Sequence, residues 1–578
     1  MTQEVATELR SEEYGPKTKI AQDKHAEKYR QKDETFTAAM NRIANHLKDS
    51  DEHYHAFRDI LLNQRFLPAG RVQASCGAAR QVTPFNCFVS QTIPDSMEGI
   101  MESAKRAAIT MRYGGGIGYD FSTLRPYGDY IKSLDASSSG PVSFMDIFNS
   151  VCGTVASAGN RRGAQMGVLR VDHPDIEKFI RVKQDLSKLK NFNISVGVTD
   201  EFMEAVQNDK EFNLVFEGRI YETIQAKPLW EEIMRSTWDY AEPGVLFLDT
   251  INRNNNLSAV ETISATNPCA EQPLPPNGAC LLGSFNLVKY LDYFAGDKLH
   301  FNISQFLADI PHVVRAMDNI VDRAIYPLPE QEREAKNKRR MGIGATGLAN
   351  CIEAMGHRYG DEKFLVIQYT LQAELADAVY AASAMLAKEK GAFPLYDEAT
   401  FNYHFVDKLT PATQALVHEY GLRNSHLLSI APTGTISLTA DNISSGIEPV
   451  FLHESERDII TPEGKETVTL KDYGVSKYGV YGKTSEECTI DDHLGVLLLA
   501  QKWVDSSVSK TCNIGPDTSF DEFKQVYVRA YKGGAKGCTT FRSEGKRAGM
   551  MRKVTEVKDE DFGAACFIDP DTGEKTCE

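Results

Sequence analysis

The sequence predicts an α/β protein built around a mostly parallel sheet or barrel. Short apolar segments of strand length occur at residues 168–171, 194–198, 245–248 and 427–430, and stretches with helical character separate them. No fixed-period repeat is visible, and no linker rich in Pro, Gly or Ser divides the chain before about residue 545. We therefore expect one large catalytic unit and not a string of small domains.

Along the chain, residues 1–32 are polar and lack periodicity, so we expect them to form an arm. An amphipathic helix should follow, because apolar residues recur there at steps of three and four: Phe36, Met40, Ile43 and Leu47. The longest predicted helix runs from about residue 362 to residue 390, with Gly391 placed to end it. Beyond about residue 545 the periodicity is lost, which predicts a mobile tail.

Composition excludes several classes of protein. The 578 residues include 64 Lys and Arg against 80 Asp and Glu, and this net charge of −16 opposes binding of a nucleic acid polymer. No apolar run approaches the roughly 18–20 residues that span a bilayer, and the N-terminus lacks an apolar signal region, so we expect a cytoplasmic location and no membrane. The 11 cysteines are too dilute for a disulfide scaffold, and the absence of a C-x-x-C pair argues against a metal site.

The densest chemical cluster lies at residues 267–271 (Asn-Pro-Cys-Ala-Glu), followed by three prolines and Cys280. Prolines at this density forbid a helix and predict a rigid loop. In an extended loop, Asn267, Cys269 and Glu271 would face the same side and meet one substrate. The alternative is that Cys269 is a small buried apolar residue and Glu271 a solvated carboxylate; the combined pattern favours the site.

Three segments resemble the catalytic subunit of ribonucleotide reductases: residues 267–271 with Cys280, residues 432–437 (Pro-Thr-Gly-Thr-Ile-Ser) and residues 446–449 (Gly-Ile-Glu-Pro). Segments 243–247, 339–344 and 501–510 occur in the family's order, and the resemblance covers roughly residues 60–545. It implies an N-terminal arm and helical segment over 1–60, a ten-stranded α/β barrel with a central finger loop over 61–545, and a flexible redox tail over 546–578.

The resemblance also implies a role for each site residue. Cys269 would become a thiyl radical, which suits reversible hydrogen abstraction because S–H and ribose C3′–H bonds are close in strength. Glu271 would be the general base and Asn267 would hydrogen-bond the ribose hydroxyls. Cys87 and Cys280 would supply two reducing equivalents by forming a disulfide. Without the resemblance, Cys87 would equally fit a structural core position between two phenylalanines.

The tail thiols Cys566 and Cys577 would reduce that disulfide and be recharged by thioredoxin or glutaredoxin. Ten residues separate them, where the family often has two, but residues 569–573 (Asp-Pro-Asp-Thr-Gly) form a strong turn signal. We therefore expect a hairpin that brings the two thiols together. The remaining six cysteines are expected to be structural.

The family binds two nucleotides. The substrate, a ribonucleoside diphosphate or triphosphate, would be held through its phosphates by the residues that follow an apolar strand: Thr433, Gly434, Thr435, Ile436 and Ser437. A deoxynucleoside triphosphate effector would bind near two loops, at residues 137–140 and 160–165, through the following residues: Asp95, Ser96, Met97, Arg125, Arg161, Arg162 and Gln165.

Effector sites of this family usually form at a homodimer interface, so we expect a homodimer. About 50 residues precede the body, too few for the family's ATP cone, and we expect no overall on/off control.

The radical source is indicated by what the sequence lacks. The oxygen-dependent class relays the radical through two adjacent tyrosines, and this chain has no Tyr-Tyr pair. The glycyl-radical class would show its own C-terminal segment and a four-cysteine zinc site, and both are missing. Residues 536–542 (Lys-Gly-Cys-Thr-Thr-Phe-Arg) instead resemble the class that uses adenosylcobalamin. The alternatives are an oxygen-dependent subunit with a radical-bearing partner, a relative of formate lyases, and a non-catalytic nucleotide-binding regulatory protein.

Overall fold

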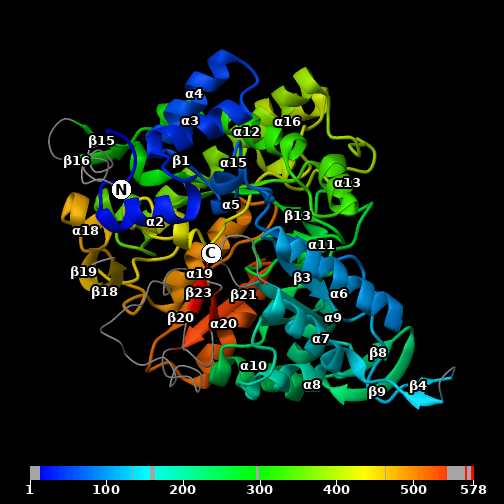
Figure 1. The fold of residues 1–578 in the computed structure, drawn as a ribbon. Helices are drawn as coiled ribbons and strands as arrows, with labels where there is room; N and C mark the ends of the chain where they lie inside the picture. Colours follow the sequence, from blue (N-terminus) through cyan, green and yellow to red (C-terminus); the bar gives the residue numbers. More distant parts are fainter. Residues whose placement is uncertain are drawn as a thin grey trace.

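The computed structural model describes residues 13–132, 135–155, 163–294, 298–461 and 464–542, and the short segments 566–568 and 575–577. The chain folds as a mixed α/β protein (Figure 1). Its largest sheet has eight strands in the order β13-β2-β3-β6-β7-β10-β21-β20. Their bounds are β13 (Ala279–Cys280), β2 (Cys87–Val89), β3 (Gly116–Asp120), β6 (Gln165–Arg170), β7 (Phe192–Val198), β10 (Gly244–Phe247), β21 (Gly537–Arg542) and β20 (Thr511–Ile514).

The centre of this sheet is parallel, as predicted. Strands β2, β3, β6, β7 and β10 each run parallel to the next, and β20 runs parallel to β21. Antiparallel pairs occur where β13 joins β2 and where β21 joins β10. Three of the four predicted strands belong to this parallel set, as β6, β7 and β10, and nearly all their residues are buried, as expected for strands covered on both faces.

A second sheet has three strands, β1 (Phe66–Pro68), β14 (Leu282–Asn286) and β17 (Gly342–Thr346). Strand β14 is antiparallel to β1 and parallel to β17. The fourth predicted strand, residues 427–430, is present only as two parallel bridges, Leu428 to Ile343 and Ile430 to Val508. This segment therefore continues the sheet beyond β17, although its pairing is too short for a regular strand.

Both predicted long helices are confirmed. Helix α3 (Phe36–Leu47) buries all four apolar residues that predicted it, and the hydroxyl of Thr35 caps it by accepting the Ala38 N–H. Helix α15 (Glu362–Lys390) has the predicted bounds and ends at Gly391, whose φ of 84° only glycine adopts easily. These helices pack with α4 (Asp51–Leu62) and α12 (Ile303–Arg323) in the upper part of Figure 1.

Residues 19–29 differ from the predicted arm, because they form helix α2 (Lys19–Tyr29) and pack against the body of the protein. The buried face of α2 consists of Ile20, Ala21, His25 and Tyr29. Two of these four residues carry polar groups, so the buried face has little hydrophobic contrast with the rest of the helix. Hydrophobic periodicity therefore could not detect it.

The remaining elements surround the sheets. The helices are α5 (Gly70–Ser75), α6 (Met97–Arg112), α7 (Gly140–Thr154), α8 (Ile176–Arg181), α9 (Asp200–Gln207), α10 (Ala226–Tyr240), α11 (Leu248–Arg253), α13 (Pro329–Lys338), α14 (Leu348–Ala354), α16 (Pro411–Tyr420), α17 (Gly434–Leu438), α18 (Tyr473–Tyr478), α19 (Ile490–Lys502) and α20 (Phe520–Lys532). The two-stranded hairpins are β4 (Tyr130–Ile131) with β5 (Ala136–Ser137), β8 (Glu211–Phe216) with β9 (Arg219–Gln225), β11 (Ala265–Thr266) with β12 (Pro273–Leu274), β15 (Leu291–Phe294) with β16 (Lys298–Phe301), β18 (Glu454–Thr461) with β19 (Gly464–Lys471), and β22 (Cys566–Ile568) with β23 (Lys575–Cys577).

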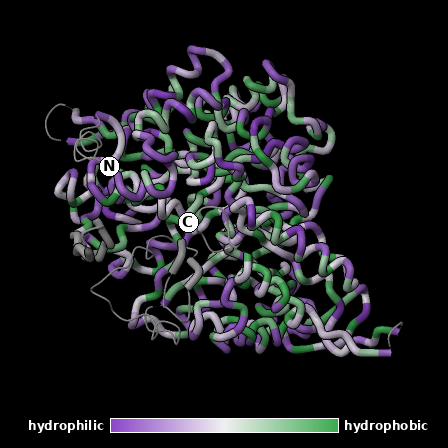
Figure 2. Tube along the Cα trace, viewed as in Figure 1, coloured by the Kyte–Doolittle hydropathy of each residue, from purple (hydrophilic) through white to green (hydrophobic). Residues whose placement is uncertain are grey.

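Polar and apolar residues alternate along the chain, with no long uninterrupted apolar stretch (Figure 2). Within the described ranges, none of the helices combines the length and the apolar character needed to cross a bilayer. Most buried apolar residues belong to one large core, and a smaller apolar cluster contains both Cys87 and Cys280.

Candidate active site

The predicted loop lies at the tip of a short hairpin. Strands β11 and β12 pair antiparallel, and residues 267–272 connect them. The Ala270 N–H donates to the Asn267 carbonyl over 3.0 Å, and Ala270 has a φ of 65°. The loop is therefore a tight turn and not the extended segment that the alternation of Asn267, Cys269 and Glu271 required. The contacts of each residue therefore determine what the loop can do chemically.

Glycines in the neighbouring strands make room for this hairpin. A Cβ on Gly118 of β3 would lie 1.8 Å from the Thr266 carbonyl oxygen. A Cβ on Gly342 of β17 would lie 2.5 Å from Nε2 of Gln272. The backbone contact at Gly118 excludes any side chain, whereas the contact at Gly342 is with the end of the Gln272 side chain, so the hairpin lies directly against β3 and touches β17 through Gln272.

Hydrogen bonds hold the loop from both sides. The Glu271 carbonyl accepts the Ser507 N–H at 3.0 Å and the Ser429 hydroxyl at 2.9 Å. The Asn267 side-chain oxygen accepts the Gln272 N–H at 3.0 Å. All five residues are buried, so water does not compete for these bonds. The backbone on each side of Cys269 is thereby fixed.

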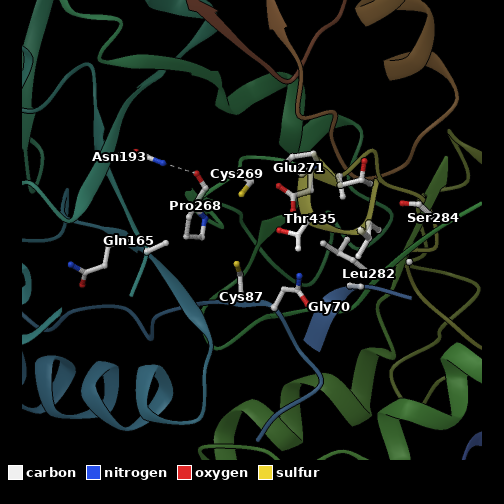
Figure 3. Close-up of a pocket in the computed structure, with 18 of the residues that line it drawn as sticks. Gly70, Cys87, Gln165, Asn193, Pro268, Cys269, Glu271, Leu282, Ser284 and Thr435 are labelled. Atoms are coloured by element: carbon white, nitrogen blue, oxygen red, sulfur yellow. Dashed lines mark hydrogen bonds between the residues drawn. The ribbon is translucent and has the colours of Figure 1, made fainter. Parts of the chain in front are cut away.

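A cavity opens beside the loop (Figure 3). Cys269, Glu271 and Cys87 all line it, and Figure 3 shows the Cys269 and Cys87 side chains on opposite sides of it, with Glu271 beside Cys269. Cys269 is half-buried, whereas Glu271 is almost completely buried. Two thiols and a carboxyl group can thus reach one small molecule.

Cys87 and Cys280 lie directly opposite each other. Strands β2 and β13 are antiparallel neighbours, and their register pairs Cys87 with Cys280. Residues paired in this way have Cα atoms roughly 4.5–5.5 Å apart, within the range of about 4.4–6.8 Å found across disulfides. Both residues are present as thiols. Burial raises the pKa of the Cys280 thiol, and the nearby Glu271, Cys87 and Cys269 raise it further. The pair can therefore form a disulfide without moving either strand.

The carboxyl group of Glu271 has an unusual protonation state. Burial raises its pKa to about 7, and hydrogen bonds from its own backbone and from the Asn267 side chain oppose part of this rise. Its Oε2 atom is buried and has no hydrogen-bond partner among the described residues. A carboxyl group that is poised near neutral pH and has an unsatisfied oxygen beside a cavity fits a general acid or base. The side chain of Asn267 is itself fully buried, with Nδ2 4.0 Å from the Cys280 sulfur.

The predicted phosphate residues surround the start of helix α17. Thr433, Thr435 and Ile436 line the cavity, and Figure 3 shows Thr435 between Glu271 and Gly70. The Thr433 hydroxyl is 3.0 Å from that of Ser437 and accepts the Gly446 N–H at 2.6 Å. Ser437 is buried behind the cavity wall, and neither it nor Gly434 lines the cavity. Three of the five predicted residues therefore face the cavity, and the Ser437 hydroxyl supports that of Thr433.

Four of the predicted effector residues gather at the start of helix α6. Arg125 forms an ion pair with Asp95, with Nε 2.6 Å from Oδ2. Ser96 caps α6 by accepting the Gly99 N–H at 3.1 Å, and the adjacent Met97 is exposed. The segment 137–140 joins this group, because the Ser138 hydroxyl donates to the Arg125 carbonyl over 3.5 Å.

The predicted second effector loop is described only in part. Arg161 and Arg162 lie outside the described residues. Gln165 begins strand β6 and lines the cavity. Its amide oxygen accepts the Tyr119 hydroxyl at 2.9 Å, and its amide nitrogen donates to the Phe148 carbonyl at 3.3 Å. Gln165 therefore belongs to the wall of the cavity, on the strand that directly follows the loop.

The C-terminal thiols lie on paired strands, as the predicted hairpin requires. Strands β22 and β23 are antiparallel, and their register places Cys566 opposite Cys577. The predicted turn at 569–573 lies outside the described residues.

Sequence reasoning missed several cavity residues. Tyr29 of α2, Asn86 and Asn193 all line the cavity. Asn193 donates from Nδ2 to the Pro268 carbonyl over 3.3 Å, the dashed line in Figure 3. Asn86 directly precedes Cys87, so its position next to a predicted thiol was an available signal. Asn193 lies in an ordinary strand and Tyr29 in a polar helix, and neither carries a signal in the sequence.

The sequence of this chain is similar to one family model and to several known proteins. The chain matches the family model described as "Ribonucleotide reductase, barrel domain" over residues 85–541. It is 34% identical over 549 residues to a vitamin B12-dependent ribonucleoside-diphosphate reductase of Mycobacterium tuberculosis, a match that covers 88% of this chain and 74% of the relative. A protein of the same description from Thermoplasma acidophilum is 33% identical over 552 residues, covering 90% of this chain and 69% of the relative. A ribonucleoside-diphosphate reductase subunit alpha of Chlamydia pneumoniae is 24% identical over 580 residues, covering 84% and 54%.

Proposed function

The chain belongs to the ribonucleotide reductase family, and we propose that it reduces ribonucleotides to 2′-deoxyribonucleotides by thiyl-radical chemistry with adenosylcobalamin as its cofactor. One observation carries the proposal: Cys269 and Glu271 line the same cavity as Cys87, which is paired with Cys280. These are the groups that the reaction needs, namely a hydrogen-abstracting sulfur, a base and a two-electron reductant.

The two sheets support a ten-stranded barrel with the β11–β12 hairpin as its central finger loop. Strands β2, β3, β6, β7 and β10 form a parallel set, and the hairpin contacts β3 and β6 of this set. Gln272 at the end of the loop contacts Gly342 of β17, whose sheet is continued by the bridges at Leu428 and Ile430. The barrel would occupy residues 61–545, with the N-terminal segment at 1–60 and the redox tail at 546–578.

A cofactor that acts on Cys269 would reach it from the cavity. The Cys269 side chain lines the cavity and is half-buried, so a bound group can approach its sulfur directly. Asn193 and Pro268, which lie beside Cys269, would form the wall against that group. When bound, adenosylcobalamin supplies the one-electron chemistry that removes the thiol hydrogen. The enclosing residues exclude water from the resulting sulfur radical.

The steps on the ribose follow from the positions of the side chains. The Cys269 radical takes the 3′-hydrogen atom, and the Glu271 carboxylate takes the 3′-hydroxyl proton. Asn267 would bind the ribose hydroxyls through Nδ2, which lies 4.0 Å from the Cys280 sulfur, although its side chain is fully buried and does not line the cavity in this structure. The 2′-hydroxyl group leaves as water, while Cys87 and Cys280 give up two electrons and two protons and become a disulfide. Glu271 gives the proton back to the 3′-oxygen, and Cys269 returns its hydrogen atom to C3′.

The tail restores the dithiol. Cys566 and Cys577, placed opposite each other by the β22–β23 pairing, would reduce the Cys87–Cys280 disulfide by exchange and become a disulfide themselves. Thioredoxin or glutaredoxin would then recharge the tail. The substrate phosphates would bind at residues 433–437.

We propose that a deoxynucleoside triphosphate effector binds around Asp95, Ser96, Met97 and Arg125 in a homodimer. Arg161 and Arg162 would complete this site. Gln165 connects the second effector loop to the substrate cavity, because it directly follows that loop and lines the cavity. A change in the loop would thus reach the substrate base within a few residues, which is the coupling that specificity control requires.

A turnover assay tests the proposal. The purified chain is incubated with cytidine diphosphate or triphosphate, dithiothreitol and an effector, with and without adenosylcobalamin, and without a second protein. We expect deoxycytidine nucleotide only when the cofactor is present, none from Cys269→Ser, and normal turnover from the matched control Cys351→Ser, a buried cysteine outside the cavity. Product without the cofactor would refute the assignment to the adenosylcobalamin class. Product only after addition of a radical-bearing subunit would support the oxygen-dependent alternative.

A further inference from the structure

Helix α2 supplies an aromatic residue to the substrate cavity. Tyr29, the last residue of α2, lines the cavity and is 7% exposed. A Cβ on Gly70 would lie 2.8 Å from Cε1 of Tyr29 and 3.1 Å from its hydroxyl oxygen. The phenol ring is therefore packed flush against Gly70, which lines the same cavity. A segment that precedes the predicted barrel thus forms part of the cavity wall.

A buried chain of hydrogen bonds holds the C-terminal half of α2 against helix α5. Arg30 donates from Nε to Nδ1 of His25 at 3.1 Å, so Nε2 of His25 carries the proton and faces Oε1 of Gln73 at 3.1 Å. Gln73 then donates from Nε2 to the Pro68 carbonyl at 2.7 Å. Burial, together with a smaller effect of the nearby Arg30, lowers the pKa of His25 to about 3, so the imidazole stays neutral at physiological pH. The direction of donation is therefore constant.

The N-terminal end of α2 is attached to the other side of the cavity. The carboxylate of Asp441 accepts the Lys17 N–H and the Thr18 N–H, each at 2.8 Å, and the Thr18 hydroxyl at 3.0 Å. Asp441 comes three residues after the end of α17. Ile20 packs in one small apolar cluster with Leu438, the last residue of α17. Helix α2 therefore connects the α5 side of the cavity to the α17 side.

We propose that α2 is a wall of the substrate site and that Tyr29 contacts the phosphate end of the nucleotide. This inference rests on the proposed function, which assigns the substrate phosphates to residues 433–437 at the start of α17. Tyr29 lines the same cavity as Thr435 and Ile436. Its hydroxyl group donates to a phosphate oxygen, and its ring excludes water from that end. His25 and Asp441 are positioning residues, because they act on the substrate through α2.

Two substitutions at Tyr29 test this contact. Tyr29→Ala is expected to raise the Kd of cytidine diphosphate, measured by equilibrium dialysis, and its KM by about tenfold or more, while kcat stays within about twofold. Tyr29→Phe keeps the ring and is expected to raise both constants by roughly three- to tenfold, the worth of one ordinary hydrogen bond. Effector affinity should not change. Lys19→Ala, on the exposed face of the same helix, is the matched control and should behave as the wild type.

Asp441→Ala provides a test outside the cavity. This substitution releases the N-terminal end of α2 and is expected to raise the Kd and KM of cytidine diphosphate by a smaller factor than Tyr29→Ala. It also tests the inference if Tyr29→Ala does not fold. A Kd for Tyr29→Ala within twofold of the wild-type value would overturn the inference and leave the reductase function intact. If Tyr29→Ala does not fold, a Kd within twofold of the wild-type value for both Tyr29→Phe and Asp441→Ala would have the same meaning. A wild-type chain that neither binds nor reduces the nucleotide would overturn the proposed function itself.

Discussion

Replacing Glu271 by Gln should stabilise the protein at alkaline pH and abolish its activity. Burial raises the pKa of Glu271 to about 7 from 4.5, its ordinary value. The folded protein therefore keeps this proton at pH values where the unfolded chain has lost it. Between about pH 4.5 and 7 the unfolded chain binds fewer protons at this position, so the free energy of unfolding falls as the pH rises and is constant above this range.

The magnitude follows from the size of the shift. The pKa rises by 7 − 4.5, about 2.5 units, and each unit corresponds to about 1.4 kcal/mol, so ionising Glu271 costs the folded state about 3 kcal/mol at pH 8. At pH 5 the unfolded chain has lost this proton only in part, so the cost to the folded state is less than about 1 kcal/mol. A glutamine side chain at this position has the same shape and no charge, so it removes this cost. Relative to the wild type, Glu271→Gln should therefore gain roughly 2–3 kcal/mol more at pH 8 than at pH 5.

Urea unfolding at the two pH values measures this difference, and comparison between pH values cancels any pH-independent effect on packing. Glu211→Gln, an exposed carboxylate on β8, is the control and should show little change. Turnover of Glu271→Gln should fall by at least about 100-fold, the usual contribution of a general base. A pH-dependent difference below about 1 kcal/mol would refute the burial argument. Turnover within tenfold of the wild type would refute the role as base.

Three further predictions concern the thiols and the loop. Cys87→Ser should abolish turnover with either thioredoxin or dithiothreitol, because the two electrons for the ribose come from this pair; substantial turnover with dithiothreitol would exclude that role. Cys566→Ser should abolish thioredoxin-dependent turnover and leave most dithiothreitol-dependent turnover; equal loss in both assays would exclude the shuttle. Gly118→Ala should destabilise the protein by about 3 kcal/mol or more in urea unfolding and reduce turnover strongly, because its Cβ would lie 1.8 Å from the Thr266 carbonyl. Gly515→Ala, whose Cβ meets no atom closer than 3.8 Å, is its control, and equal stability of the two variants would show that the hairpin can move aside.

Part of this structure could be predicted from local sequence alone. Helices α3 and α15 follow from apolar spacing and from Gly391, and strands β6, β7 and β10 follow from short apolar runs. These signals are local, because each depends on residues within one element. The chemical identities of the site residues were equally clear, since Asn267, Cys269 and Glu271 lie within five positions.

Other features depend on contacts between distant parts of the chain. Cys87 and Cys280 are paired only because β13 adds to β2 antiparallel in this register, across 193 positions of sequence. The reasoning from an extended loop was wrong, because Ala270 turns the chain back on Asn267. Glu271 owes its raised pKa to burial by surrounding segments, and no property of the residues beside it in the sequence indicates that burial.

Helix α2 shows most clearly what could not be predicted from the sequence. Its residues are polar, so the sequence indicates an arm, yet its buried face is held by His25, Tyr29 and the distant Asp441. Polar groups can be buried when each meets a partner, and those partners come from α5 and from the chain after α17. The sequence by itself thus indicated which residues could do the chemistry and where helices α3 and α15 and strands β6, β7 and β10 lie. The tertiary structure alone decided which thiols meet, how acidic the base is and which segments enclose the cavity, because burial and pairing arise only after distant segments have packed together.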